Sequence, residues 1–90
     1  MEFEWDESNS EKPRRHGLTI EETEEAFFDV DKVVFDDWKH SESEKRAILL
    51  GKTKKNKLLN IAFTLRKRRI RVITARVINK KEVKFYEKET

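Results

Sequence analysis

Residues 57–78, KLLNIAFTLRKRRIRVITARVI, decide the fold. Segment 57–65 has the pattern of a strand with one buried face, because large apolar residues alternate with smaller or polar ones. These large residues are Leu59, Ile61, Phe63 and Leu65. The basic triplet 66–68 predicts a hairpin loop, and 69–78 predicts the next strand. Segment 69–78 is apolar at both odd and even positions in its middle, so we expect a central strand with both faces covered.

The segments before this hairpin extend the same sheet. Residues 45–52, KRAILLGK, predict a strand that a second hairpin loop at 53–56 joins to the strand after it. Residues 33–35 predict a further strand, and Phe3 and Trp5 alternate with acidic residues in a short first strand. Loops this short allow only antiparallel pairing of neighbouring strands.

A helix is predicted over about 20–28. Thr19 and Glu22 have the spacing of a capping box, in which each side chain binds the backbone N–H of the other residue. The inward face of this helix would carry Ile20, Thr23, Ala26 and Phe27.

Two further helices are indicated by their ends. The polar segment before Gly17 predicts a short helix that ends at His16, and Pro13 restricts where this helix can start. Asn79 can cap a last helix with Glu82 at its third position. In that helix Val83 and Tyr86 share one face.

We therefore predict an α+β fold in a single domain over residues 1–90. It has an antiparallel sheet of four to five strands, two N-terminal helices that cover one face, and a C-terminal helix. The chain lacks cysteine, a signal peptide and any apolar stretch long enough for a membrane helix, so we expect a cytoplasmic protein with no membrane partner.

Charge divides the chain into two halves. Residues 1–45 carry 6 Lys or Arg and 15 Asp or Glu, whereas residues 46–90 carry 15 and 3, so the net charges are −9 and +12. The basic half is interleaved with apolar strand residues and is not a disordered tail. This asymmetry predicts a face that binds a polyanion, most often a nucleic acid.

Short motifs along residues 3–87 are familiar in their order and spacing. They are Phe3-Glu4-Trp5-Asp6, His16-Gly17-Leu18-Thr19, Phe27-Phe28-Asp29, His40-Ser41-Glu42 with Glu44 and Arg46, Leu50-Gly51, the run from Arg71 to Arg76, and Glu82 with Tyr86 and Glu87. Together they resemble the BrnT family of bacterial toxins, the ribonuclease half of BrnT–BrnA toxin–antitoxin systems. Arg15 stands where that family usually has a lysine, and Pro13 lies in a segment shorter than the family's.

The resemblance implies a RelE-like fold and RNA cleavage that inhibits translation, on ribosomes or on free RNA. It also implies a BrnA-type antitoxin, a small ribbon-helix-helix DNA-binding protein, which would supply any contact with DNA. No metal or other cofactor is expected. Two alternatives stay open: a non-catalytic basic nucleic-acid-binding module, and a degenerate toxin that acts as a partner or corepressor of the antitoxin.

Metal-independent cleavage needs proton transfer at the ribose 2′-OH and the leaving oxygen, and cations on the phosphate. Arginine suits the phosphate because its planar fork matches two oxygens. We predict Arg71 and Arg76 as the catalytic clamp, with Arg69 as a helper. Simple alternation puts Arg71 and Arg76 on opposite faces, so both can serve one site only if a bulge intervenes or one lies at the strand end. The alternative is a solvated basic strand.

His16 and Tyr86 are the other predicted catalytic residues. His16 is a candidate for proton transfer because an imidazole can donate or accept a proton, although a cation at the end of a helix is also expected from the helix dipole. Tyr86 is a proton donor or stacking residue in one interpretation and a packed anchor of the last helix in the other. Glu82 is favoured as a capping carboxylate over a catalytic base.

Basic residues in or beside the hairpin loops are predicted to contact RNA phosphates without sequence preference. They are Arg46, Lys54, Lys55, Lys57, Arg66, Arg68 and Arg69. The loops open at opposite ends of one strand, so they cannot line a single small pocket. Glu44 and Arg46 start a strand where they could border the active site. A metal site near His40, Asp36, Asp37 and Glu42 is a weaker alternative to a solvated loop.

Overall fold

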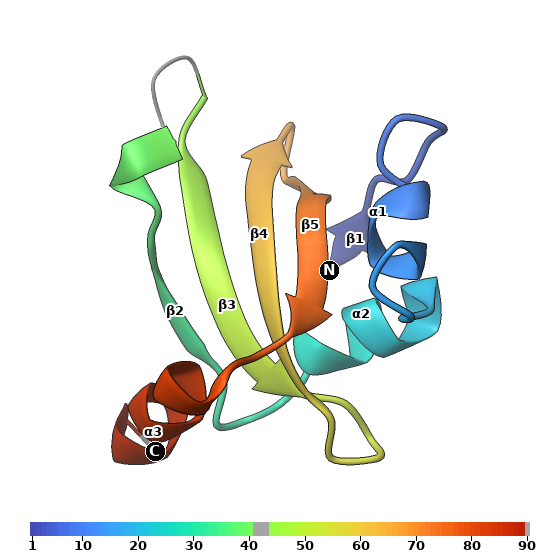
Figure 1. Ribbon diagram of the computed structural model, residues 1–90. Coiled ribbons are helices and arrows are strands. Elements are labelled where there is room, and N and C mark those ends of the chain that lie inside the picture. The colour runs from blue at the N-terminus through green and yellow to red at the C-terminus, as the bar shows by residue number, and fades with distance from the viewer. Residues whose placement is uncertain (41–43, 90) are drawn as a thin grey trace.

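The computed structural model describes residues 1–40 and 44–89, and it confirms the predicted α+β fold (Figure 1). A five-stranded sheet has the order β1-β5-β4-β3-β2 and packs against three α-helices. The strands are β1 (Glu2–Phe3), β2 (Val33–Asp36), β3 (Arg46–Lys52), β4 (Leu58–Arg66) and β5 (Arg69–Val77). The helices are α1 (Glu11–Arg14), α2 (Ile20–Ala26) and α3 (Lys80–Glu89), and a short 3-10 helix, η1 (Trp38–His40), follows β2.

Strands β2 to β5 form the predicted antiparallel meander, but β1 differs. It pairs in parallel with β5 through Glu2↔Arg69 and Phe3↔Ile70, so the sheet is mixed. A parallel neighbour requires a long connection, and the chain supplies it by passing through α1, α2 and the whole meander before β5. The first strand thus lies beside the last one.

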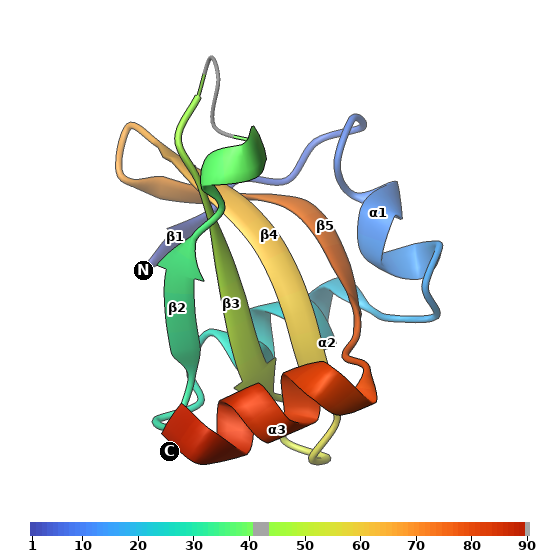
Figure 2. The same cartoon turned by 60° about the vertical axis from the view of Figure 1, so that its left-hand side comes forward.

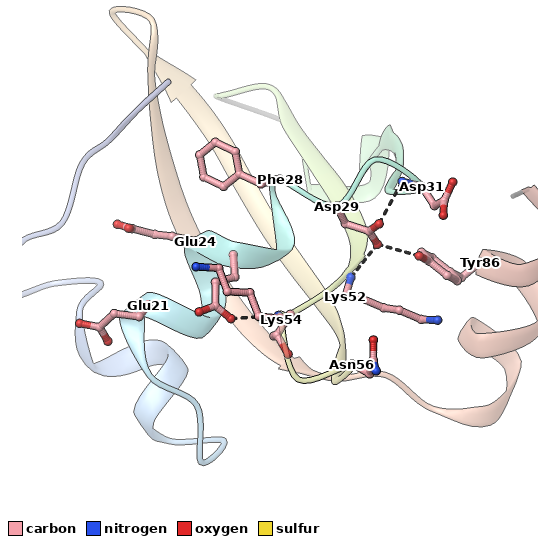
Figure 3. A pocket seen from close by; sticks show the side chains of 11 residues that line it. Glu21, Glu24, Phe28, Asp29, Asp31, Lys52, Lys54, Asn56 and Tyr86 are labelled. Atoms are coloured by element: carbon pink, nitrogen blue, oxygen red, sulfur yellow. Dashed lines mark hydrogen bonds between the residues drawn. The ribbon is translucent and has the colours of Figure 1, made fainter.

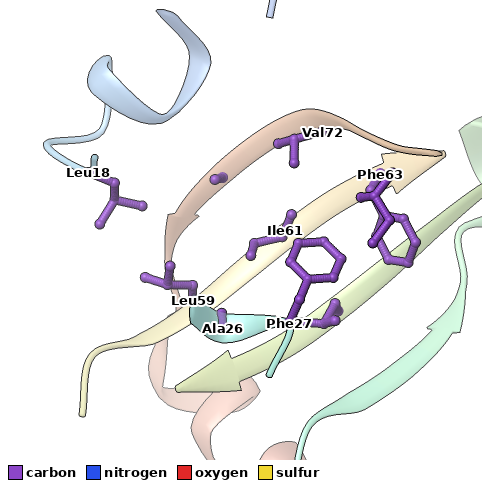
Figure 4. Close-up of a cluster of buried hydrophobic side chains, with 10 residues drawn as sticks. Leu18, Ala26, Phe27, Leu59, Ile61, Phe63 and Val72 are labelled. Atoms are coloured by element: carbon purple, nitrogen blue, oxygen red, sulfur yellow. The ribbon is translucent and has the colours of Figure 1, made fainter. Parts of the chain in front are cut away.

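One face of the sheet packs on α2 and forms the larger core (Figure 4). Alternate residues of the central strands, including Leu49, Ile61 and Val72, are buried against Ala26 and Phe27 of the helix and its C-cap. The predicted capping box is present: Thr19 Oγ1 accepts from the Glu22 N–H, and the Glu22 carboxylate accepts from the Thr19 N–H. The predicted strand is present as β4, but the prediction that only one of its faces is buried is wrong: residues on both faces are buried from Leu59 to Thr64, and Leu65 is exposed.

The opposite face is covered at only one end, by α3 (Figure 2). Tyr86 and Val83 of this helix pack with Leu50 and Ile78, as their shared face predicted. The predicted cap is also present, because the Asn79 side chain accepts from the Glu82 N–H and the Glu82 carboxylate accepts from the Asn79 N–H. No helix in the described residues is long and apolar enough to cross a membrane.

A bulge in β5 explains why its middle is apolar at both parities. Ala62 pairs with Thr74 and Phe63 with Val72, so Ile73 is an extra residue between the two pairs. The prediction that both faces of this strand are covered is wrong: Thr74 is exposed and Arg71 is half-buried. The bulge instead changes which parity faces the core, so that Val72 and Ala75, three residues apart, both lie there.

The segment before Gly17 folds much as predicted. Helix α1 ends at Arg14 with Arg15 as its C-cap, and Gly17 adopts a φ of +73° in the left-handed region that favours glycine. Pro13 is tolerated because it lies in the first turn, where backbone N–H groups have no helical acceptor. His16 therefore lies in the turn after the helix.

Gly51 sets the distance between α2 and the sheet. A Cβ atom there would lie 2.4 Å from the Ala26 backbone oxygen. We expect Gly51→Ala to lower the free energy of unfolding by about 1–3 kcal/mol, since the helix backbone must move away from β3. Urea unfolding checks this, with Gly17→Ala as a control whose Cβ meets nothing within 4 Å and costs only backbone strain. An unchanged stability in Gly51→Ala would contradict this close packing.

Candidate functional site

Arg71 is held among polar side chains of the N-terminal segment. Its guanidinium donates to Glu4 Oε1 at 3.0 Å, to both Asp6 oxygens at 2.8 and 3.1 Å, and to Ser8 Oγ. Its side chain is only 11% exposed. Hydrogen bonds from Arg71 and Ser8 hold the pKa of Asp6 well below its usual range. The arginine fork is therefore fixed in direction before any ligand arrives.

Arg46 and Arg71 lie on either side of Thr64 across the sheet. Arg46 pairs with Thr64 in β4, and Thr64 pairs with Arg71 in β5, so the three side chains form a row on the face opposite the larger core. Thr64 is buried and its hydroxyl donates to the Lys45 carbonyl at 2.7 Å. The two arginines lie on β3 and β5, the strands on either side of β4, so their backbones are roughly 10 Å apart across the sheet.

A cavity of about 160 Å³ opens at this row. Among the described residues, four cationic side chains line it, with one carboxylate, that of Glu44. The cations are Lys12, Arg46, Arg66 and Arg71. Such a concentration of positive charge fits a phosphate group, which has the oxygens to accept from several guanidinium and ammonium donors.

Asn9 is a buried residue that sequence reasoning missed. Its amide donates to the Glu4 carbonyl and to the Val72 carbonyl, each at 3.0 Å, and its oxygen accepts from the Asp6 N–H at 2.8 Å. It thus ties the segment that carries Glu4 and Asp6 to β5 next to the bulge. In the sequence it is only one more polar residue in a polar segment, and nothing marks it as buried.

Arg76 lies on the same face as Arg71, because the bulge at Ile73 intervenes. It pairs with Asn60 in β4, four residues from the Thr64 that pairs with Arg71, so the two arginines are roughly 14 Å apart along the sheet. The bulge thus puts both arginines on one face of the sheet, but their guanidinium groups are too far apart to bind one phosphate. The predicted clamp is therefore spread along the strand.

Glu82 holds Arg76 in a two-pronged ion pair, with both contacts at 2.8 Å. Asn60 donates to the same carboxylate at 2.6 Å. Burial opposes ionisation of Glu82, but hydrogen bonds from Arg76 and from the Asn79 N–H outweigh it and lower the pKa. The capping interpretation of Glu82 is confirmed.

Tyr86 lies away from Arg71, beside a separate cavity of about 840 Å³ at the β3–β4 turn (Figure 3). It is 3% exposed, and its hydroxyl donates to Asp29 Oδ2 at 2.6 Å. Burial and the Asp29 carboxylate raise the pKa of Tyr86. Burial also opposes ionisation of Asp29, yet hydrogen bonds from Tyr86 and the Lys52 N–H lower its pKa. Tyr86 is thus a packed anchor of α3, as in the alternative interpretation.

The other predicted residues are His16 and the basic residues of the two hairpin loops. His16 is exposed, four residues after Lys12, which lines the cavity with Arg71. The two basic loops open at opposite ends of β4, as predicted, so Arg66, Arg68 and Arg69 lie toward the Arg71 end. The remaining residues, Lys54, Lys55 and Lys57, lie at the other end.

Several basic residues are paired with carboxylates. Lys57 contacts Glu22 at 2.8 Å, and Arg69 contacts Glu2 at 3.4 Å.

The alternative metal site includes Glu42, which lies outside the described residues. Among the described residues no group of three or more His, Asp or Glu side chains is arranged to hold a metal ion.

Removal of the Asn9 amide tests its structural role. We expect Asn9→Ala to lower the free energy of unfolding by about 2–3 kcal/mol, because the buried Val72 carbonyl loses its donor and the Asp6 N–H its acceptor. Urea unfolding measures the loss. Ser10→Ala is the control, since Ser10 makes no side-chain capping bond. Equal stability of both variants would show that Asn9 does not hold this segment.

Loss of the Tyr86 hydroxyl should give a pH-dependent effect. We expect Tyr86→Phe to cost about 1–2 kcal/mol at neutral pH, where Asp29 is ionised. The hydrogen bond lowers the folded-state pKa of Asp29, so its contribution is present above the unfolded pKa near 3.9 and disappears as pH falls through the lowered value. Unfolding measured at neutral and strongly acidic pH should show this shrinking difference. A constant difference would contradict it.

Comparison with known proteins identifies the family of the chain. A protein-family model described as ribonuclease toxin, BrnT, of type II toxin–antitoxin system matches residues 5–82, which include Asn9 and the row of Arg46, Thr64 and Arg71. A search of curated proteins found none that matches the chain. The family match spans most of the 90 residues. The chain therefore belongs to the BrnT family of ribonuclease toxins of type II toxin–antitoxin systems.

Proposed function

We propose that this toxin is a metal-independent endoribonuclease that cleaves RNA by attack of the ribose 2′-OH on the adjacent phosphate. Family membership supplies the RNA substrate and an antitoxin partner. The observation that carries the proposal is the cavity where Arg71, Arg46, Arg66 and Lys12 converge. Its cations can neutralise the charge that develops on the phosphate oxygens in the transition state.

In this proposal Arg71 binds the scissile phosphate. Its orientation by Glu4 and Asp6 removes much of the entropy that a mobile arginine would lose on binding. A phosphate oxygen then competes with the more exposed Asp6 carboxylate for the guanidinium. Arg76, roughly 14 Å along the sheet, contacts a phosphate further along the RNA rather than the scissile one.

His16 is proposed as the proton donor to the leaving 5′-oxygen. It is exposed in the turn that follows α1, and Lys12 of that helix lines the cavity. Imidazole suits the task because its ordinary pKa lies near neutral pH. Tyr86 has no part in this scheme, since its hydroxyl is buried against Asp29.

The partner is proposed to be a BrnA-type antitoxin, a ribbon-helix-helix protein that covers the basic surface and supplies the contact with DNA. The opposite charges of the two halves of the chain support this proposal, because a cover for the basic half needs acidic groups. Inhibition of translation through RNA cleavage sets the proposed location in the cytoplasm.

A second candidate function is RNA binding without cleavage. It is favoured by the saturation of Arg71 with carboxylates and a hydroxyl, which would equally suit an arginine whose task is to fix the N-terminal segment. The two functions differ in what loss of Arg71 does. In a binding module, loss of Arg71 lowers the affinity for RNA. In an enzyme, it lowers turnover far more than the affinity for RNA.

The test is RNA cleavage by the purified chain in EDTA, with and without ribosomes. We expect products that end in 2′,3′-cyclic phosphate, and we expect Arg71→Ala to reduce cleavage by about 100-fold or more. Arg14→Ala is the matched control, because Arg14 is an exposed arginine paired with Glu11. Circular dichroism of both variants separates loss of fold from loss of activity. RNA binding without any cleavage by the unaltered chain would support the second candidate instead.

A further inference from the structure

The carboxylate of Glu44 is the acidic group of the cavity that contains Arg71. Among the described residues that line this cavity, no other carries a carboxylate. Glu44 lies two residues before Arg46, at the start of β3, and is 34% exposed, so a ligand in the cavity can reach it. The other carboxylates near Arg71, those of Glu4 and Asp6, bind its guanidinium directly.

Charged groups from several elements act on Glu44. Arg66 at the end of β4 donates to its two oxygens at 2.8 and 3.3 Å. This hydrogen bond, with the nearby charges of Arg46 and Arg71, lowers the pKa of Glu44. Lys12 of α1 lines the same cavity, and Asp36 and Lys45 line with Glu44 a neighbouring cavity of about 380 Å³. Glu44 is therefore ionised at neutral pH and surrounded mainly by cations.

Cleavage by 2′-OH attack needs a base close to the scissile phosphate, and an ionised carboxylate has lone pairs for the proton. A carboxylate held beside phosphate-binding arginines meets this requirement. The ribose that is bonded to the scissile phosphate through its 3′-oxygen carries the attacking 2′-OH, so this hydroxyl lies close to the arginines. Glu82 and Asp29 are excluded from this task, since they lie toward the opposite end of β4, where they contact Asn60 and Lys52.

We propose that Glu44 is the general base of the reaction, and this inference rests on the proposed ribonuclease function. A Glu44 oxygen takes the proton of the 2′-OH while the 2′-oxygen forms a bond to phosphorus. The bond from phosphorus to the 5′-oxygen breaks, and the leaving oxygen receives a proton from the imidazolium of His16. The products are a 2′,3′-cyclic phosphate and a 5′-hydroxyl, and both side chains then exchange protons with water.

The first experiment compares Glu44→Gln with the unaltered chain on a mixed-sequence RNA in EDTA, with ribosomes added in parallel. Glutamine keeps the size of the side chain but accepts no proton at neutral pH. We expect kcat/KM to fall by about 100-fold or more. Affinity for the same RNA with 2′-O-methyl groups, which cannot be cleaved, should stay within about threefold or become tighter because a negative charge is removed. Glu11→Gln is the matched control, since Glu11 also pairs with an arginine, Arg14.

A second variant tests the role of Glu44 even if Glu44→Gln does not fold. Arg66→Ala leaves Glu44 in place but removes the hydrogen bond that lowers its pKa. The pKa of Glu44 should then rise. Cleavage by Arg66→Ala should therefore begin to fail at a higher pH on the acid side of the profile than cleavage by the unaltered chain. A purely structural ion pair would not move this limb.

The outcomes separate the two proposals. Activity of Glu44→Gln within threefold of the unaltered chain, or an acid limb that Arg66→Ala does not shift, would overturn the assignment of Glu44 while the ribonuclease function stands. Parallel loss of cleavage and of 2′-O-methyl RNA binding would assign Glu44 to the binding surface only and would also overturn it. Absence of cleavage by the unaltered chain would instead overturn the proposed function on which this inference rests.

Discussion

The buried amide of Asn9 is the contact on which the rest of the site depends. It satisfies the Val72 carbonyl beside the bulge and holds the backbone of Glu4 and Asp6 in the same set of hydrogen bonds. Strand β1 is only two residues long, so it cannot by itself fix the segment that follows it. Because a buried carbonyl without a donor is costly, the geometry of the bulge and the position of the N-terminal segment are coupled.

The bulge determines which charges share a surface. In a regular strand without the bulge, Arg71 and Arg76 would be five residues apart and on opposite faces, one of them against the apolar core. With it, the basic residues of β3, β4 and β5 lie on a face that α3 covers at only one end (Figure 2). The acidic helix α2 packs on the other face of the sheet, whereas the carboxylates of Glu4, Asp6 and Glu44 pair with arginines of the basic face.

Local rules predicted much of the fold. The Thr19–Glu22 and Asn79–Glu82 caps depend on residues three apart, so both were visible in the sequence. The alternation in β4 located the strand but did not show that both of its faces are buried. The bulge was not visible in the sequence, because apolar residues at both parities of β5 fit a doubly buried strand equally well. Asn9 and Tyr86 could not be placed either, since their partners Val72 and Asp29 are 63 and 57 residues away. The sequence did mark Arg71 and the segment around Glu44, although the ion pairs of both arise only from tertiary packing.

The parallel pairing of β1 with β5 has a consequence for the order of assembly. Glu4 precedes Arg71 by 67 residues, and two helices and most of the meander lie between them. Contacts of such large sequence separation form late in folding, because their loop-closure entropy is lost before they contribute. During synthesis, helix α2 and the β3–β4 hairpin can therefore pack together before β5 has been made. The cationic cavity, which needs β5 and the first nine residues together, is completed near the end of folding, so a partly synthesised chain carries no finished site.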